Sequence, residues 1–232
     1  MKFLISLLFL LTITLAKNQD ERFTQQREEM VEKQIINRGI SDRKTINAMR
    51  DVPRHLFVPQ NLVDVAYNDT PLSIGYGQTI SQPYIVALMT QTAEPGERKK
   101  VLEVGTGSGY QAAILAQIVD SVFTIEIVDE LAKRSSELLR KLEYNNIVVK
   151  SGDGYKGWPE HSPFDIIIVT AAPEQIPEPL IDQLAENGRM VIPVGDQQTY
   201  QELILAIKRK GKITTRKVAS VRFVPFVRSS NY

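Results

Sequence analysis

Residues 101–110 read Val-Leu-Glu-Val-Gly-Thr-Gly-Ser-Gly-Tyr, and the fold of the chain follows from them. The apolar residues at 101–104 predict a buried strand, and the alternate glycines that follow predict a tight turn. The apolar periodicity over 111–118 then predicts a helix. A strand that leads through a glycine-rich turn into a helix is typical of an open α/β sheet, in which ligands bind at the carboxyl ends of strands. We therefore expect a ligand at this turn.

The same alternation of strands and helices continues toward the C-terminus. A helix is predicted over 130–142, and strands are predicted at 122–127, 147–150, 165–170 and 190–194. The strand at 165–170 is apolar without alternation, which indicates a central strand covered on both faces. Further on, the segments 203–207 and 217–224 are joined by the turn Lys210-Gly211-Lys212 and predict an antiparallel edge. We expect an α/β fold with a doubly wound, mainly parallel sheet.

The chain before this unit is predicted to be a helical section. Apolar residues over 30–36 have helical spacing, and Gly39 can end that helix in a left-handed turn. The Ser-Asp pair at 41–42 predicts the cap of a second helix, which stops before Pro53. Residues 54–71 form a long connection, and connections of that length are usually functional or closely packed.

The first residues differ in character from the rest of the chain. Residues 1–16 form an apolar leader that resembles the core of a signal peptide and is too short to span a bilayer comfortably. Export, a retained anchor and a true start at Met30 are all compatible with it. Residues 17–29 are polar and are interpreted as a linker or a first surface helix. A single folded domain is expected over residues 30–232.

Composition excludes several classes of function. The 28 Lys+Arg residues nearly balance the 27 Asp+Glu residues, so no global field attracts nucleic acid or an anionic membrane. The chain has no cysteine and so neither disulfides nor thiolate metal ligands. Its histidines, His55 and His161, lack the spacing of metal ligands, and we expect them, like Trp158, to have packing roles. No metal site is predicted.

The spacing of the glycines and acidic residues indicates the ligand. A dinucleotide fingerprint needs its third glycine where Tyr110 stands, whereas here it falls at Gly109, which argues against NAD. Glu126 closes the next predicted strand, where a carboxylate can accept both hydroxyls of a ribose, although a solvated strand end is the alternative. Glu103, just ahead of the turn, would repel a pyrophosphate but suits a ligand that carries a sulfonium and an ammonium. These charges favour S-adenosylmethionine.

Further segments of the chain share a family resemblance. They read Pro-Arg-His-Leu-Phe-Val-Pro from 53, Gly-Gln-Thr-Ile-Ser-Gln-Pro from 77, Gly-Asp-Gly-Tyr-Lys-Gly-Trp from 152, Phe-Asp-Ile-Ile-Ile-Val-Thr-Ala-Ala from 164 and Val-Arg-Phe-Val-Pro from 221. With the glycine turn they resemble, in order, the bacterial protein-L-isoaspartate O-methyltransferases. The glycine turn alone is typical of methyltransferases in general, and residues 79–83 narrow the resemblance to this family.

The resemblance implies a Rossmann-like fold of the S-adenosylmethionine-dependent methyltransferase type, with an N-terminal helical section, and a set of site residues. The cofactor-binding residues would be Gln78, Thr79, Ile80, Glu103, Gly105, Gly107, Glu126, Asp153 and Gly154. Ser81 would be the catalytic residue between cofactor and substrate, and Val224 would line the peptide groove. From the residues alone, Ser81 could instead cap the helix that begins near Pro83, and Asp153 could be an ordinary turn residue.

The activity implied by the resemblance is protein repair. A methyl group would pass from S-adenosylmethionine to the free carboxylate of L-isoaspartyl residues in damaged proteins and peptides, and the ester would collapse to a succinimide. The implied partners are isoaspartyl proteins, with no nucleic acid and no stable membrane partner, and the enzyme would be a monomer. The family and the supply of the methyl donor favour the cytoplasm, whereas the leader favours export. A methyltransferase with another acceptor and a non-catalytic module that binds the cofactor are the alternative functions.

Overall fold

The computed structural model describes residues 21–228 of the chain. The apolar leader expected over residues 1–16 therefore lies outside the described residues. Between residues 21 and 228, no helix combines the length and the apolar character that are needed to cross a membrane.

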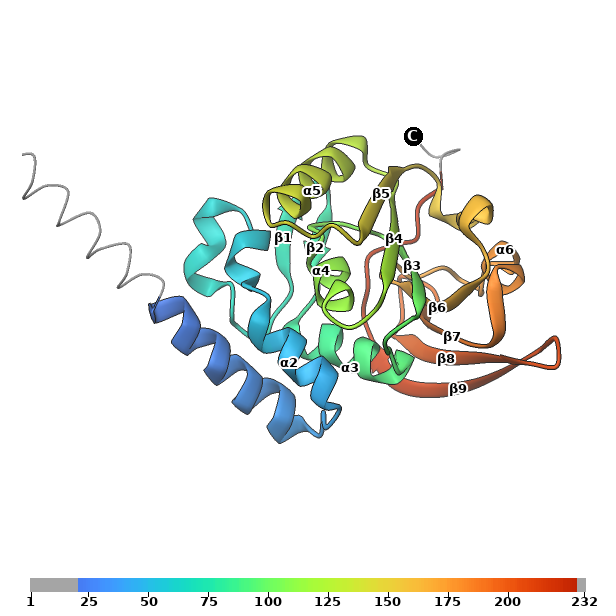
Figure 1. Ribbon diagram of the computed structural model, residues 1–232, viewed down its shortest axis with the longest axis horizontal. Helices are drawn as coiled ribbons and strands as arrows, with labels where there is room; N and C mark the ends of the chain where they lie inside the picture. The colour runs from blue at the N-terminus through green and yellow to red at the C-terminus, as the bar shows by residue number, and fades with distance from the viewer. Residues whose placement is uncertain (1–20, 229–232) are drawn as a thin grey trace, which may run out of the picture.

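A seven-stranded sheet forms the centre of the molecule (Figure 1). In sheet order its strands are β5 (Ile147–Ser151), β4 (Ser121–Glu126), β3 (Lys100–Val104), β6 (Phe164–Val169), β7 (Leu184–Val194), β8 (Gln201–Arg209) and β9 (Lys212–Val221). Neighbours from β5 to β7 are parallel, whereas β8 is antiparallel to both β7 and β9. The predicted Rossmann-like sheet with an antiparallel edge is confirmed.

The apolar run predicted as the central strand is β6, which lies between β3 and β7. Ile166 and Ile167 pair with Val101 and Leu102 of β3, and all residues of β6 except Asp165 are buried. A strand in this position has both faces covered, so it needs apolar side chains on both sides.

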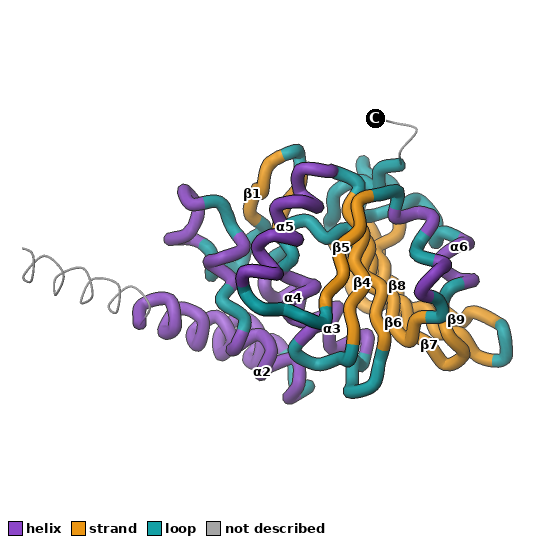
Figure 2. Tube along the Cα trace, turned by 45° about the horizontal axis from the view of Figure 1, so that its top comes forward, coloured by secondary structure: helices purple, strands orange, loops and turns teal. Residues whose placement is uncertain are grey.

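The two faces of the sheet bury separate sets of apolar side chains. Along β3, Val101 packs into one cluster, and Leu102 and Val104 pack into the other. The first face is covered by α2 (Arg43–Asp51), α3 (Pro83–Ala93), α4 (Tyr110–Ala116) and α5 (Asp129–Lys141), while the second is covered by α6 (Glu178–Asp182) and the 3-10 turns η5 (Gly154–Lys156) and η6 (Pro159–His161). Figure 2 shows α2 to α5 on one side of the strands and α6 on the other.

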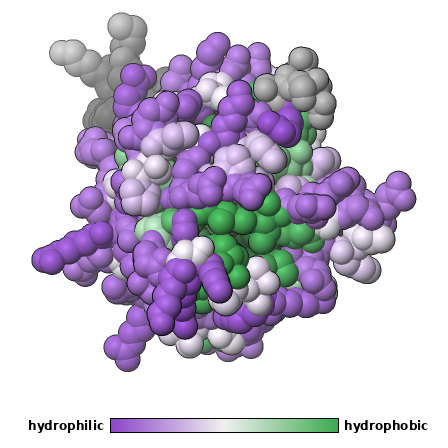
Figure 3. Space-filling view, turned by 90° about the vertical axis from the view of Figure 1, so that its right-hand side faces the viewer, coloured by the Kyte–Doolittle hydropathy of each residue, from purple (hydrophilic) through white to green (hydrophobic). Residues whose placement is uncertain are grey.

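The second face is incompletely covered at its antiparallel end. The only helix there within residues 21–228 is the five-residue α6, and residues 195–200 connect β7 to β8 without a helix. Several apolar side chains are therefore only partly buried, namely Ile176, Ile181, Val194, Ile204 and Ile213. Figure 3 shows apolar side chains gathered in one area on this side of the molecule and bordered by hydrophilic ones.

The helical section expected before the sheet forms much as predicted. A helix over residues 21–30 continues into η1 (Val31–Ile35) and η2 (Ile36–Arg38), and Gly39 ends it with a left-handed φ of 91°. Asp42 caps α2 by accepting a hydrogen bond of 2.8 Å from the backbone N–H of Thr45. This helix stops at Asp51, ahead of Pro53, because the residue before a proline disfavours helical angles.

Residues 17–29, interpreted as a linker or a first surface helix, are helical from residue 21 onward. This helix is packed against the rest of the chain through Phe23, whose side chain is only 4% exposed and stacks on the ring of His55 at 4.1 Å. A single apolar residue in a polar stretch gives no periodicity, so its burial could not be read from the sequence.

The long connection over 54–71 is closely packed. It contains the 3-10 turns η3 (Arg54–Phe57) and η4 (Gln60–Val65), with Arg54 and Phe57 buried. The hairpin of β1 (Leu72–Gly75) and β2 (Gln78–Ile80) follows and leads directly to α3. This hairpin brings residues 79–82 toward the carboxyl edge of the sheet.

Candidate active site

The glycine turn between β3 and α4 forms the floor of the candidate site. Gly105, Gly107 and Gly109 have φ values of 99°, 53° and 87°, a region that residues with a side chain rarely adopt. A Cβ on Gly105 would lie 2.3 Å from Oγ1 of Thr170, the residue that follows β6. The turn therefore requires glycine both for its backbone angles and for the close approach of a neighbouring strand end.

Glu126 ends β4 and holds the turn from the side. Its Oε2 accepts a hydrogen bond of 2.7 Å from the N–H of Gly107, and its Oε1 accepts one of 3.0 Å from the N–H of Val128. Burial raises the pKa of this carboxyl, and these backbone N–H groups lower it in part. Each carboxylate oxygen keeps a further lone pair, so Glu126 can still accept hydrogen bonds from the hydroxyls of a ligand.

Glu103 is the least satisfied polar group of the site. Its side chain is fully buried, and Oε2 accepts a hydrogen bond of 2.5 Å from Thr124 Oγ1. Its Oε1 is buried and has no hydrogen-bond partner within residues 21–228. Burial and, to a lesser degree, the nearby charge of Glu126 raise the pKa of Glu103 to about 8. A ligand ammonium would supply the missing partner, so this carboxyl fits S-adenosylmethionine.

Asp153 and Gly154 follow β5 at the same edge of the sheet. The side chain of Asp153 accepts a hydrogen bond of 3.0 Å from the N–H of Tyr155, which caps η5, so the turn role that the sequence suggested is present. A Cβ on Gly154 would lie 2.4 Å from Val104 Cγ1, which brings this loop against β3. The parallel order of β5, β4 and β3 therefore gathers the ends of these strands at one site.

Ser81 lies where two hollows of the surface meet. It lines a small cavity together with Glu103, Gly105, Gly107, Thr79 and Ile80. It also lines a groove of about 440 Å³ that includes Thr79, Thr170 and Val224. The structure thus brings together most of the predicted site residues. Gln78, at the start of β2, lines neither hollow, and neither do Glu126, Asp153 and Gly154, which lie at the ends of β4 and β5.

The interpretation of Ser81 as a helix cap is wrong. The residue that precedes α3 is Gln82, and no side chain caps this helix, which begins with Pro83. A proline at the first helical position has no N–H to be satisfied, so a cap is less needed. Instead, the backbone carbonyl of Ser81 accepts a hydrogen bond of 2.8 Å from Arg54 Nη2. Sequence reasoning missed Arg54, although it lies in the Pro-Arg-His-Leu-Phe-Val-Pro segment that supported the resemblance.

The packing roles predicted for the histidines and for Trp158 are confirmed. His55 Nδ1 lies 2.8 Å from the hydroxyl of Tyr67. His161 stacks on Phe123 at 4.2 Å, and Trp158 packs edge-on against the same ring at 5.5 Å. In the described part of the chain, no group of three or more His, Cys, Asp or Glu side chains could hold a metal ion.

The segment after β9 returns across the carboxyl edge of the sheet. Ala172 donates a hydrogen bond of 2.9 Å to the carbonyl of Val224 and accepts one of 3.0 Å from the N–H of Phe226. These bonds hold Val224 beside the groove that Ser81 lines. Val224 was found by the family resemblance, whereas no local pattern predicts that the chain returns here.

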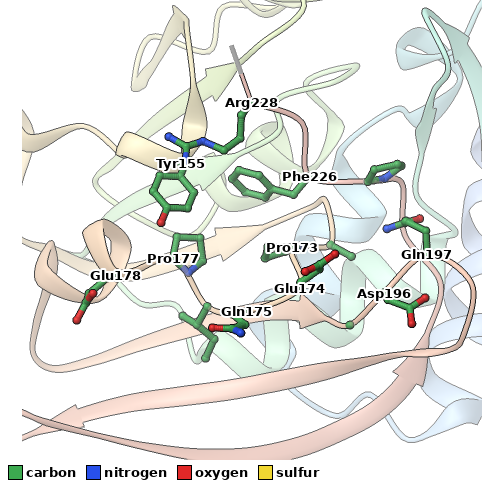
Figure 4. Close-up of a pocket in the computed structure, with 14 residues that line it drawn as sticks. Tyr155, Pro173, Glu174, Gln175, Pro177, Glu178, Asp196, Gln197, Phe226 and Arg228 are labelled. Carbon is green, nitrogen blue, oxygen red and sulfur yellow. The ribbon is translucent and has the colours of Figure 1, made fainter. Parts of the chain in front are cut away.

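A second cavity of about 540 Å³ lies on the other side of this segment. Figure 4 shows Tyr155, Phe226 and Arg228 together on one side of it, with Glu174 and Asp196 opposite. The guanidinium of Arg228 lies 3.7 Å from the centre of the Tyr155 ring, and its Nε lies 3.5 Å from Asp153 Oδ2. The C-terminal segment therefore also covers Asp153.

The site combines three features: a glycine turn at the carboxyl edge of a mainly parallel sheet, an acidic residue at the end of the next strand, and a buried carboxylate that lacks a cationic partner. Together these features define a class of protein. This class is the S-adenosylmethionine-dependent methyltransferases. The family model for protein-L-isoaspartate(D-aspartate) O-methyltransferase matches residues 25–231. The chain belongs to this family.

Curated relatives agree with the family model. The chain is 52% identical to a protein-L-isoaspartate O-methyltransferase of Opitutus terrae, over 97% of each chain. It is 53% identical to one of Gloeobacter violaceus, over 86% of this chain and 97% of the relative. The protein is therefore a repair methyltransferase that uses S-adenosylmethionine.

Solved structures support the same assignment. A protein-L-isoaspartate O-methyltransferase with 27% identity superposes with a TM-score of 0.79 and covers 86% of this chain and 65% of that longer chain. A member from Plasmodium falciparum, crystallised with S-adenosyl-L-homocysteine, has 29% identity and a TM-score of 0.74. It covers 87% of this chain and 98% of its own.

Proposed function

We propose that Ser81 orients the free carboxylate of an L-isoaspartyl residue toward the methyl donor. The observation that carries this role is the position of Ser81, which lines both the cavity beside the glycine turn and the groove that contains Val224. A hydroxyl at such a junction can donate a hydrogen bond to a carboxylate that enters from the groove.

The reaction depends more on orienting the two reactants and removing water from them than on proton transfer. When bound, S-adenosylmethionine supplies an electrophilic methyl group. A carboxylate, with an ordinary pKa near 4, is already a nucleophile at neutral pH and needs no general base. The work of the protein is then to align the two reactants and to exclude water from them. Ser81 would align the carboxylate, and the apolar side chain of Ile80 would help to keep the cavity dry.

Three acidic residues would hold the cofactor. Glu103, with its unpaired buried oxygen, would bind the ammonium of the methionine end, and the N–H groups of the glycine turn would bind its carboxylate. Glu126 would accept hydrogen bonds from the ribose hydroxyls, and Asp153 with Gly154 would contact the adenine. Their order along the sheet edge, from β3 through β4 to β5, matches the order of these groups in the cofactor.

The groove is suited to a peptide in extended conformation. It is lined by residues 219–224, which continue from β9 toward the C-terminal segment, and by Thr79 and Tyr84 on the opposite wall. We propose that an isoaspartyl peptide lies along residues 219–224, with its side-chain carboxylate directed at Ser81. We propose that the active form is a monomer.

Methyl transfer to an isoaspartyl peptide tests the proposal. We expect turnover with this peptide and none with its aspartyl twin. Ser81→Ala should lower kcat and leave the affinity for S-adenosyl-L-homocysteine and the melting temperature nearly unchanged, because Ser81 caps no helix. Full turnover of Ser81→Ala would remove Ser81 from the mechanism.

We propose that the enzyme acts in the cytoplasm. The reason is that its methyl donor is made and kept there, so an exported enzyme would need a separate supply. The mature N-terminus in fractionated cells is the measurement that decides. A periplasmic product that begins near Lys17 would contradict a cytoplasmic site of action.

A further inference from the structure

Arg54 is among the largest fully buried side chains of the described residues. It stands at the start of η3, between the N-terminal helices and the carboxyl edge of the sheet. Burial lowers the pKa of its guanidinium to about 10, so the group still carries its positive charge at neutral pH. A buried cation costs considerable free energy unless it is paired or well hydrogen-bonded.

Among the described residues, the charge of Arg54 has no carboxylate partner. None of the ion pairs within residues 21–228 includes it. Its Nη1 is buried without a hydrogen-bond partner in the same part of the chain. The guanidinium carbon lies 4.9 Å from the centre of the Tyr110 ring, a cation–π contact that stabilises the charge only modestly.

The hydrogen bonds of Arg54 lead to the acceptor side of the site. Its Nε donates to the carbonyl of Ala66 at 2.7 Å, and its Nη2 donates to the carbonyl of Ser81 at 2.8 Å. Tyr110, against which it packs, follows Gly109 at the end of the glycine turn. The guanidinium of Arg54 thus contacts three parts of the structure: Ala66 in the long connection, Ser81 on the acceptor side, and Tyr110 at the end of the glycine turn.

The Ser81 hydroxyl depends on its own backbone for its position. Among residues 21–228, the hydrogen bond that involves Ser81 and another side chain is the one that its carbonyl accepts from Arg54. Gln82 and Pro83 follow at once, and no side chain caps the helix that they begin. Movement of the Ser81 backbone would therefore carry the hydroxyl with it.

We propose that Arg54 is a positioning residue for methyl transfer, which fixes the backbone of Ser81 and so holds the hydroxyl that orients the acceptor carboxylate. The inference rests on the role proposed for Ser81. The rigid fork of a guanidinium can reach two carbonyls at once, whereas a lysine ammonium, on a flexible stem, cannot reproduce that geometry. The uncompensated charge lies on the same side as the acceptor and adds a favourable potential for an anionic substrate.

Arg54→Lys tests the proposal, because it keeps the charge and removes the fork. We expect kcat with an isoaspartyl peptide to fall by about 10- to 100-fold, as a small misplacement of the acceptor would cause. The peptide KM and the affinity for S-adenosyl-L-homocysteine should stay near their original values. Arg27→Lys is a matched control, since Arg27 also donates to a backbone carbonyl, that of Arg50, but does not contact Ser81. Its kcat should not change.

A double mutant shows whether Arg54 acts through Ser81. In the Ser81→Ala background, Arg54→Lys should cause little further loss of kcat, because the hydroxyl that Arg54 positions is gone. A second full loss in the double mutant would overturn the proposal, as would wild-type kcat in Arg54→Lys or a parallel loss of cofactor affinity. If Ser81→Ala has reduced turnover but Arg54→Lys has normal turnover, the role proposed for Arg54 is refuted and the role proposed for Ser81 stands. Normal turnover in Ser81→Ala would refute the proposed role of Ser81 and this inference with it.

Discussion

Glu103 gives the cofactor-free enzyme a carboxyl group that holds its proton near neutral pH. The pKa of about 8 arises mainly because burial disfavours the charged form, and the hydrogen bond from Thr124 offsets this only in part. A cationic ligand at the unpaired Oε1 would restore the charged form. Cofactor binding and the ionisation of Glu103 are therefore coupled.

Glu103→Gln is expected to change how the stability of the cofactor-free enzyme depends on pH. The folded protein holds this proton up to about pH 8, whereas the unfolded chain loses it near the ordinary value of 4.5. The stability due to the group is thus complete below pH 4.5 and is lost as the pH rises through about 8. Calorimetry across this range should show the melting temperature of the wild type falling relative to the variant. Parallel curves would mean that Glu103 is ionised throughout.

Glu126→Ala and Asp153→Ala are expected to weaken cofactor binding. Each removes an acceptor from a buried polar contact worth about 1 to 3 kcal/mol, which is roughly 5- to 150-fold in Kd. Glu126→Ala should cost more, because its carboxylate also holds the N–H of Gly107. Calorimetric titration with S-adenosyl-L-homocysteine measures both variants, and Glu174→Ala, at an exposed position of the second cavity, serves as the control. Unchanged affinity in both variants would mean that the adenosine binds elsewhere.

At the scale of elements, the glycine turn tolerates substitution poorly. Gly105 and Gly211 both have positive φ, but a Cβ would meet Thr170 Oγ1 at 2.3 Å in the first and nothing within 4 Å in the second. We expect Gly211→Ala to lower the free energy of unfolding by about 1 to 2 kcal/mol from backbone strain alone. Gly105→Ala should lower it further and abolish cofactor binding. Urea unfolding and ligand titration measure the two effects, and equal losses of stability would contradict the crowding at Gly105.

The termini of elements show how far local patterns can predict structure. The predictions that Gly39 ends one helix and that Asp42 helps to cap the next were correct, because each residue acts through its own backbone or through that of the next turn. Ser81 resembled a cap equally well, yet the helix begins one residue later and needs none. β7 begins at Leu184, before the predicted 190, because Leu184 pairs with Phe164 of β6, and a bulge before the next pair, Arg189 with Ile166, takes in polar residues such as Glu186 and Asn187. Pairing with a neighbour is not visible in a local pattern.

At the scale of the whole molecule, the helix over residues 21–30 holds the N-terminal section to the rest of the chain. Phe23 packs on His55, and Arg27 donates hydrogen bonds to the carbonyl of Arg50 and to Tyr67. A chain that begins at Met30 should lose about 3 to 5 kcal/mol of stability, the usual cost of removing a buried aromatic side chain. Urea unfolding compares it with a chain that begins at Glu21, which keeps these contacts. Equal stability of the two chains would show that the helix does not contribute.

The sequence by itself determined the sheet, the glycine turn and the class of ligand. These follow from local causes: the apolar run of β6 requires burial on both faces, alternate glycines require left-handed angles, and Glu103 beside the turn selects a cationic ligand. The family resemblance supplied Ser81 and Val224. Only the tertiary structure decided that Arg54 lies behind Ser81, that Phe23 is in the core and that Val224 is held by Ala172. These contacts join residues far apart in the chain, and burial of an isolated side chain depends on which distant segment covers it.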